Sequence, residues 1–112
     1  MLDKIFNFSH PITQQQLDDI SAAYQIPSAD IEVVNIKVQI DFDEALRPQI
    51  SNIVNQINVR PGDDIYIVLP DSAVAAVLIV DCLFARGARV HLIRFGQVSF
   101  KEIISVGGLI NL

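Results

Sequence analysis

Residues 64–95 read DIYIVLPDSAVAAVLIVDCLFARGARVHLIRF, and this run decides the fold. Its first part, Asp64 to Leu69, is almost continuously apolar, which is typical of a strand covered by helices on both faces of a sheet. Its last part, Arg89 to Phe95, predicts a second strand. Because a helix separates them, the two strands should run in the same direction, and the run predicts a β-α-β unit whose first strand is central.

The helix of this unit is predicted over Ala73 to Arg86. The turn Pro70-Asp71-Ser72 supplies an N-cap candidate, and Gly87 occupies the left-handed position that commonly follows a helix. The residues in between are apolar almost all round, which predicts a buried helix with Cys82 as an inert core thiol.

Two more pairs of strand and helix precede this unit. Leu2 to Phe8 predicts a strand, and Thr13-Gln14-Gln15-Gln16 is a capping box that predicts the start of a helix. Pro27 ends that helical pattern. Ile31 to Phe42 is rich in strand-favouring residues and predicts the best-defined strand of the chain, with room for one bulge near Asn35.

A second apolar stripe predicts a helix from about Pro48, a residue suited to a first helical turn. The stripe consists of Leu46, Ile50, Ile53, Val54 and Ile57. Arg60-Pro61-Gly62-Asp63 then predicts a turn. After Gly96, the tail Lys101 to Leu112 offers two short apolar pieces separated by Gly107-Gly108.

These elements predict a single small α/β domain over residues 1–112, with a Rossmann-like, mostly parallel sheet flanked by helices. With 112 residues, of which 51% are apolar and 19% charged, the chain is long enough to fold around one core. Ligands of such sheets bind beyond the carboxyl ends of the strands, where loops and helix amino termini gather.

Composition excludes several classes of partner. A formal charge of -5 disfavours long nucleic acids, because their binding depends on Lys and Arg. No apolar run reaches the roughly 20 residues of a membrane span, and we expect no secretion signal. A single cysteine cannot form an internal disulfide, so a cytoplasmic location is expected. Two histidines and one cysteine without ligand spacing predict no metal site, and no cofactor is expected.

The densest polar cluster, Asn7-Phe8-Ser9-His10-Pro11, ends the first predicted strand. Its side chains could hold a ligand, or they could bond the backbone of a turn. Pro70-Asp71-Ser72-Ala73 leads into a helix whose free amides favour a phosphate, although Asp71 or Ser72 could equally cap that helix. Gln39 could read an adenine edge. These ten residues are the predicted ligand site, and none of them is assigned a catalytic role.

Other polar residues carry weaker signals. The arginines available as phosphate partners are Arg60, Arg86, Arg89 and Arg94, each of which also has a structural interpretation. His91 alternates with apolar neighbours inside a predicted strand, which favours a packed histidine over a ligand or a base. The residues therefore predict a binding site for a phosphate-bearing ligand rather than a self-sufficient acid-base, nucleophilic or metal enzyme.

The opening strand, followed by Asn7-Phe8-Ser9-His10-Pro11-Ile12-Thr13 and a glutamine-rich helix start, resembles the Csx-fifteen family of CRISPR-associated proteins. The similarity elsewhere concerns layout and covers most of the chain: Val38-Gln39-Ile40-Asp41, the helix from Pro48, the loop at Pro70 with the alanine-rich helix after it, Val90 to Arg94, and Ile110-Asn111-Leu112.

That family is similar to the CRISPR-associated Rossmann-fold (CARF) sensors. The resemblance implies a protein that binds cyclic tetra-adenylate, the second messenger of type III CRISPR antiviral defence, and damps signalling by sequestering it. A cyclic ligand with four phosphates is met by two copies of a site across a two-fold axis, so the resemblance implies a homodimer or a higher homo-oligomer.

Two other classes stay open. A metal-independent ring nuclease would let the ligand's own 2′-hydroxyl attack the adjacent phosphate, with Ser9 or His10 assisting. A purely structural subunit would instead present a large apolar surface and bind no small ligand.

Overall fold

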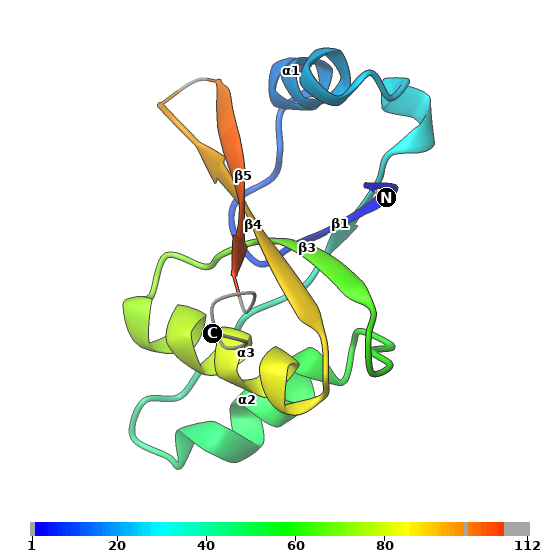
Figure 1. Cartoon of the computed structure of the whole chain (residues 1–112). Helices are drawn as coiled ribbons and strands as arrows, with labels where there is room; N and C mark the ends of the chain where they lie inside the picture. The colour runs from blue at the N-terminus through cyan, green and yellow to red at the C-terminus, as the bar shows by residue number, and fades with distance from the viewer. Residues whose placement is uncertain (1, 98, 107–112) are drawn as a thin grey trace.

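The computed structural model describes residues 2–97 and 99–106 (Figure 1). Its elements follow the order β1 (Lys4–Asn7), α1 (Gln14–Tyr24), β2 (Glu32–Asn35), α2 (Leu46–Val54), β3 (Asp64–Val68), α3 (Ala73–Ala85), β4 (Arg89–Phe95) and β5 (Phe100–Val106). A short 3-10 turn, Ser28–Asp30, precedes β2. The strands form a sheet in the order β2-β1-β3-β4-β5, in which β1 to β4 are parallel and β5 is antiparallel. The expected small α/β domain with a mostly parallel sheet is confirmed.

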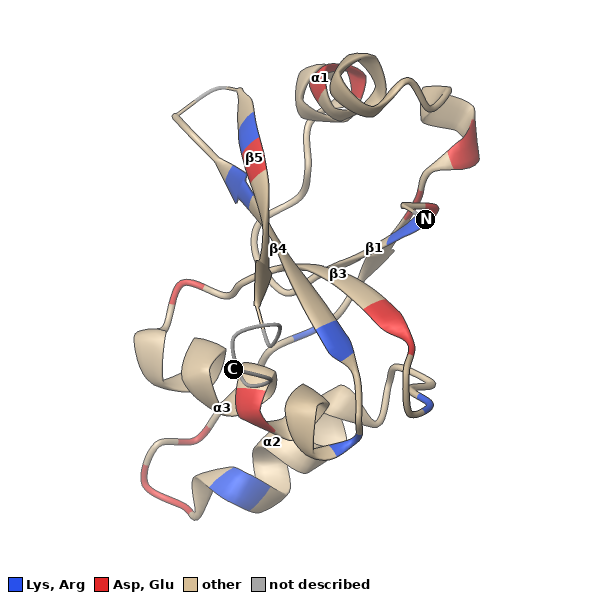
Figure 2. Ribbon diagram, in the orientation of Figure 1, with Lys and Arg blue, Asp and Glu red and all other residues tan. Residues whose placement is uncertain are grey.

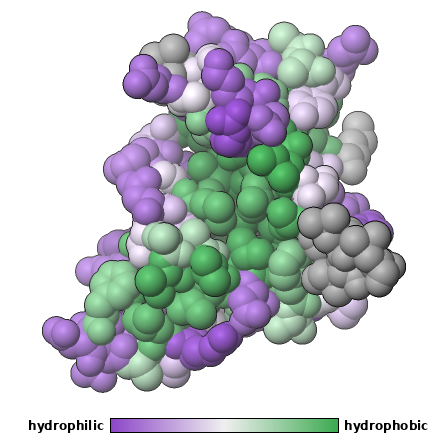
Figure 3. Space-filling model, turned by 60° about the vertical axis from the view of Figure 1, so that its left-hand side comes forward, coloured by the Kyte–Doolittle hydropathy of each residue, from purple (hydrophilic) through white to green (hydrophobic). Residues whose placement is uncertain are grey.

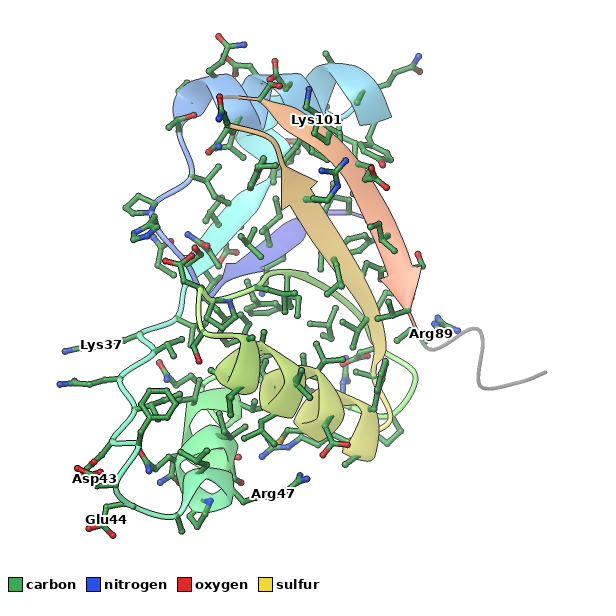
Figure 4. The ribbon with its side chains drawn as sticks, turned by 90° about the vertical axis from the view of Figure 1, so that its left-hand side faces the viewer. Lys37, Asp43, Glu44, Arg47, Arg89 and Lys101 are labelled. Carbon is green, nitrogen blue, oxygen red and sulfur yellow. The ribbon has the colours of Figure 1, made fainter. Side chains whose placement is uncertain are left out.

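Helices lie on both faces of the sheet (Figures 1 and 4). α1 lies on one face, while α2 and α3 pack against each other on the opposite face. Successive residues of a strand point to opposite faces, so Ile67 joins the apolar cluster beneath α2 and α3 whereas Val68 joins the cluster beneath α1. β3 lies in the middle of the strand order, as predicted for Asp64 to Leu69. The sheet thus separates two apolar cores.

Local signals set the helix ends. The Thr13 hydroxyl accepts from the Gln16 amide at 3.1 Å and the Gln16 side chain accepts from the Thr13 amide at 2.9 Å, which confirms the predicted capping box. Ser72 caps α3 by accepting from the Ala75 amide at 3.3 Å. Gly87 has φ 84° directly after α3, where a side chain would be strained. These three local predictions are confirmed.

The prediction of a strand from Ile31 to Phe42 is wrong beyond Asn35, where β2 ends. Among the described strands, β2 lies at the edge of the sheet and pairs with β1, which ends at Asn7. The Ile36 amide donates to the Asn7 carbonyl at 2.8 Å, and beyond this bond the described residues offer β2 no further strand to pair with. Residues 36–42 therefore leave the sheet, and α2 begins at Leu46 instead of Pro48.

The prediction that α3 is buried all round is also wrong. Ala75, Ile79 and Leu83 are buried, but Val77 is 67% exposed and Val74 is 51% exposed. α3 packs against α2 and the sheet, and its outer face has no covering element among residues 2–97 and 99–106. Cys82 packs against the core cluster but is only half-buried.

The predicted tail divides in the structure. Its first apolar piece forms β5, which pairs with β4 along its length. Gly107-Gly108 and the terminal Ile110-Asn111-Leu112 lie outside the described residues.

Candidate ligand-binding site

A cavity of about 570 Å³ opens at the carboxyl ends of β1, β2 and β3. It is lined by the segments that follow these strands: residues 8–10, residues 36–40 with Phe42, and residues 70–72. The strand order reverses here, because the chain passes from β1 to β2 on one side and reaches β3 on the other. Ligands of parallel sheets bind at such a reversal. The cavity therefore has the position of a ligand site.

Asn7 lies beneath the cavity and positions one of its walls. Its side chain is 1% exposed, and the Nδ2 group donates to the His10 carbonyl at 2.8 Å and to Asn35 Oδ1 at 3.0 Å. Its Oδ1 accepts from the Ser9 amide at 3.0 Å. Asn7 thus folds the loop after β1 and ties it to the end of β2. Asn7 is not part of the cavity lining. Of the two roles predicted for it, ligand binding and bonding the backbone of a turn, the second is observed.

Ser9, His10 and Asp71 link two of the cavity walls. His10 Nε2 lies 2.9 Å from Asp71 Oδ2, and the Ser9 hydroxyl lies 3.5 Å from Asp71 Oδ1. The His10 and Asp71 side chains are 84% and 76% exposed, so their contact contributes little to stability. A protonated His10 would, however, offset the negative charge that Asp71 presents to an anionic ligand.

The loop before α3 places three of its four predicted residues in the cavity lining. Pro70, Asp71 and Ser72 line the cavity, whereas Ala73 does not. The Ser72 hydroxyl is bonded to the Ala75 amide, so its capping role is observed. Pro11 also lies outside the lining, while Phe8 and Gln39 are in it.

The structure adds five lining residues that were not part of the predicted site, and two of them, Lys37 and Phe42, bring a charge and an exposed ring; the others are Ile36, Val38 and Ile40. Lys37 is exposed, has no ion-pair partner within residues 2–97 and 99–106, and extends outward from the segment between β2 and α2 (Figure 4). Phe42 is a large apolar side chain that is 59% exposed. Sequence reasoning missed both residues because residues 36–42 were predicted to continue a strand. The signal in the sequence was a lysine and an aromatic residue five positions apart, flanking Gln39.

The four arginines considered as phosphate partners are absent from this lining. Each is engaged elsewhere: Arg60 with Asp63, Arg86 with Ser51, Arg89 with Asp64 and Arg94 with Glu102. Positive and negative residues alternate along the ribbon instead of gathering on one element (Figure 2). Lys37 is therefore the cation that the described part of the chain offers to a ligand in this cavity.

The cavity combines one cation, one exposed aromatic ring, an imidazole, hydroxyls and the Gln39 amide. No group of three or more His, Cys, Asp or Glu residues in the described chain is arranged to hold a metal ion. None of the described helices has the length and hydropathy needed to span a bilayer. Comparison with protein-family models, curated proteins and solved structures finds no match to this chain. Chemically, the arrangement suits an anionic ligand that also carries aromatic bases.

Proposed function

We propose that this protein binds cyclic tetra-adenylate and sequesters it, damping type III CRISPR antiviral signalling in the cytoplasm as a Rossmann-like member of the Csx-fifteen family. One observation carries the proposal. The polar segment after β1, which bears the family resemblance, shares a cavity with the loop before α3, with Lys37 and with Phe42.

The lining residues match the chemistry of an adenine nucleotide. The Lys37 ammonium is a mobile point charge suited to a phosphate. Phe42 offers a face on which a base can stack, and base stacking on an aromatic side chain contributes about 1–3 kcal/mol. The exposed Gln39 amide has the paired donor and acceptor that read the N6 and N7 edge of adenine. The phosphate, the face of the base and the edge of the base thus each have a matching side chain in the lining.

Sequestration is favoured over cleavage by the way the polar groups are used. His10, the imidazole of the lining, is directed at Asp71, and the Ser72 hydroxyl is occupied by the helix cap. A ring nuclease would need the cavity to hold the ligand's 2′-hydroxyl in line with its phosphate, because such a reaction depends on positioning more than on protein nucleophiles. Slow ring opening is therefore the alternative function.

A homodimer forms part of the proposal. A cyclic ligand with two-fold symmetry would be held between two copies of this cavity, one from each chain. The outer face of α3 begins beside the cavity, since Ser72 lines it and Ala73 follows. Val74, Val77 and Leu78 extend this face into an apolar hollow, and Figure 3 shows a broad apolar surface on this side of the molecule. This surface supports a contact with a second copy of the chain.

The first experiment mixes excess purified protein with cyclic tetra-adenylate and follows retention and chemical integrity of the ligand over hours. We expect the ring to be retained intact. Linear tetra-adenylate serves as the matched ligand control and should be retained less. Linear product that disappears in a Ser9→Ala, His10→Ala double variant would establish the ring nuclease instead. If the ligand is neither retained nor cleaved, both functions are overturned.

Replacement of Val77 by glutamate is expected to convert the dimer into a monomer. The substitution places a charge on the most exposed apolar side chain of α3, where it would be desolvated in the interface. Sedimentation velocity or light scattering measures the mass with and without cyclic tetra-adenylate. Glu32→Gln changes an exposed residue on edge strand β2 and should leave the mass unchanged. A wild-type chain that is monomeric under both conditions would contradict the dimer.

A further inference from the structure

A second cavity, of about 630 Å³, lies on the opposite face of the sheet. Its walls come from the end of α1 and from β3, β4 and β5. Tyr66, His91 and Ser105 form one row across these three strands, because Tyr66 is in register with His91 and His91 with Ser105. All three residues line the cavity. None belongs to the candidate site for cyclic tetra-adenylate.

His91 joins a serine to an aspartate. Its Nδ1 lies 2.7 Å from the Ser105 hydroxyl, and its Nε2 lies 2.9 Å from Asp64 Oδ1. Both distances are those of hydrogen bonds. A hydroxyl bonded to an imidazole that is in turn held by a carboxylate is the arrangement that activates serine nucleophiles on unrelated folds.

The charge on Asp64 sets the direction of these bonds. Arg89 donates from Nε and Nη2 to the two carboxylate oxygens of Asp64, each at 2.9 Å. The hydrogen bonds from Arg89 and then from His91 hold the pKa of Asp64 well below its usual range. An ionised Asp64 accepts a hydrogen bond from the N–H group at His91 Nε2, so in the neutral imidazole Nδ1 carries no proton. The Ser105 hydroxyl therefore donates to a free imidazole nitrogen.

His91 is held rigidly while Ser105 stays accessible. The His91 ring stacks on Tyr66 with centroids 4.5 Å apart and planes 21° apart, and its side chain is 16% exposed. Ser105 is exposed on β5. If the three side chains served only to hold three strands together, hydrogen bonds would be sufficient. A reactive serine must also be reachable from solvent and lie beside a cavity, and Ser105 meets both conditions.

We propose that Ser105 is a nucleophile for small aryl esters, with His91 as its general base and Asp64 as the residue that positions His91. The Ser105 oxygen bonds to the carbonyl carbon while its proton passes to His91 Nδ1. The carbon–oxygen bond to the aryl group then breaks, and the phenol leaves with that proton. Water, activated by the same imidazole, hydrolyses the acyl-serine to a carboxylic acid and restores the hydroxyl.

The cavity walls define the substrate class. Leu2, Ile26 and Ile103 supply an apolar surface, and Tyr66 supplies an aromatic one. Gln25 also lines the cavity, and its side-chain amide carries N–H groups of the kind that stabilise a developing oxyanion. This combination suits an uncharged ester with an aromatic leaving group.

The test measures p-nitrophenolate release from p-nitrophenyl acetate by the full chain, with peptide mass mapping to locate the acetyl group. General-base assistance accelerates such steps by roughly 10²–10⁴-fold. We therefore expect Ser105→Ala to lower the release rate by about 100-fold. Ser99→Ala, in the same hairpin, is the matched control and should keep the wild-type rate.

Substitutions of His91 distinguish a general base from a residue that only holds the strands together. His91→Phe keeps a ring on Tyr66 but removes the base, and should lose release to the same extent as Ser105→Ala. His91→Gln keeps side-chain hydrogen bonding and covers the case in which the phenylalanine variant fails to fold; circular dichroism reports folding of each variant. Ser105→Ala should still retain cyclic tetra-adenylate, because the cavities share no residue. Acetylation of Ser105 no faster than Ser99, or a wild-type rate in Ser105→Ala, would overturn the proposal.

Discussion

Replacement of Asn7 by alanine is expected to lower the free energy of unfolding by about 3 kcal/mol, because a buried side chain that bonds two backbone groups and one further side chain is removed. The His10 carbonyl, the Ser9 amide and Asn35 are the groups affected. Urea denaturation measures the effect as a lower midpoint at unchanged slope. The loop that forms one cavity wall would also lose its anchor, so affinity for cyclic tetra-adenylate should fall in the same variant.

A surface asparagine provides the control for this prediction. Asn52 is exposed in the middle of α2, and Asn52→Ala should change the free energy of unfolding by no more than about 0.5 kcal/mol. If Asn7→Ala unfolds at the same urea concentration as Asn52→Ala, the hydrogen-bonded anchor beneath the cavity contributes nothing and the description of this wall is wrong.

The second large effect is expected from reversing the charge of Lys37, which should weaken binding of cyclic tetra-adenylate by about 100-fold. A charge-assisted hydrogen bond contributes about 1.5–3 kcal/mol, and each 1.4 kcal/mol is a factor of ten in affinity. In a dimer the ring would meet two copies of the lysine. Isothermal titration calorimetry of Lys37→Glu measures the loss directly.

Lys101→Glu is the matched control for charge, because Lys101 is also exposed but lies on β5, away from the cavity (Figure 4). It changes the net charge by the same amount and should alter affinity only through long-range repulsion, which added salt removes. Equal losses in Lys37→Glu and Lys101→Glu at high salt would show that Lys37 makes no specific contact with the ligand.

The sequence predicted the features that depend on neighbouring residues. The capping box at Thr13, the cap at Ser72 and the stop at Gly87 are each specified within one helical turn, and all are observed. The central place of β3 and the meeting of the loops after β1 and β3 follow from general rules for parallel sheets. These rules placed Phe8, Ser9 and the Pro70 loop around one cavity.

Features that depend on distant segments were not predicted. The length of β2 is set by where β1 ends, which periodicity within residues 31–42 does not reveal. That error hid Lys37 and Phe42. The bonds from His91 to Asp64 and Ser105 depend on the register of three strands, and an alternating strand pattern indicates a packed histidine without naming its partners. The uncovered face of α3 is likewise a property of the assembled chain.

The division of the apolar core by the sheet has a consequence for how this chain can change over evolutionary time. The cavity at the carboxyl ends of the strands draws on the cluster that contains Phe8 and Ile36, and the cavity near α1 draws on the cluster that contains Leu2. Substitutions in separate clusters share few neighbours, so their effects on stability should add. Either proposed activity could therefore be tuned, lost or acquired by drift while selection preserves the other, because the two cavities depend on different apolar clusters of one folded chain.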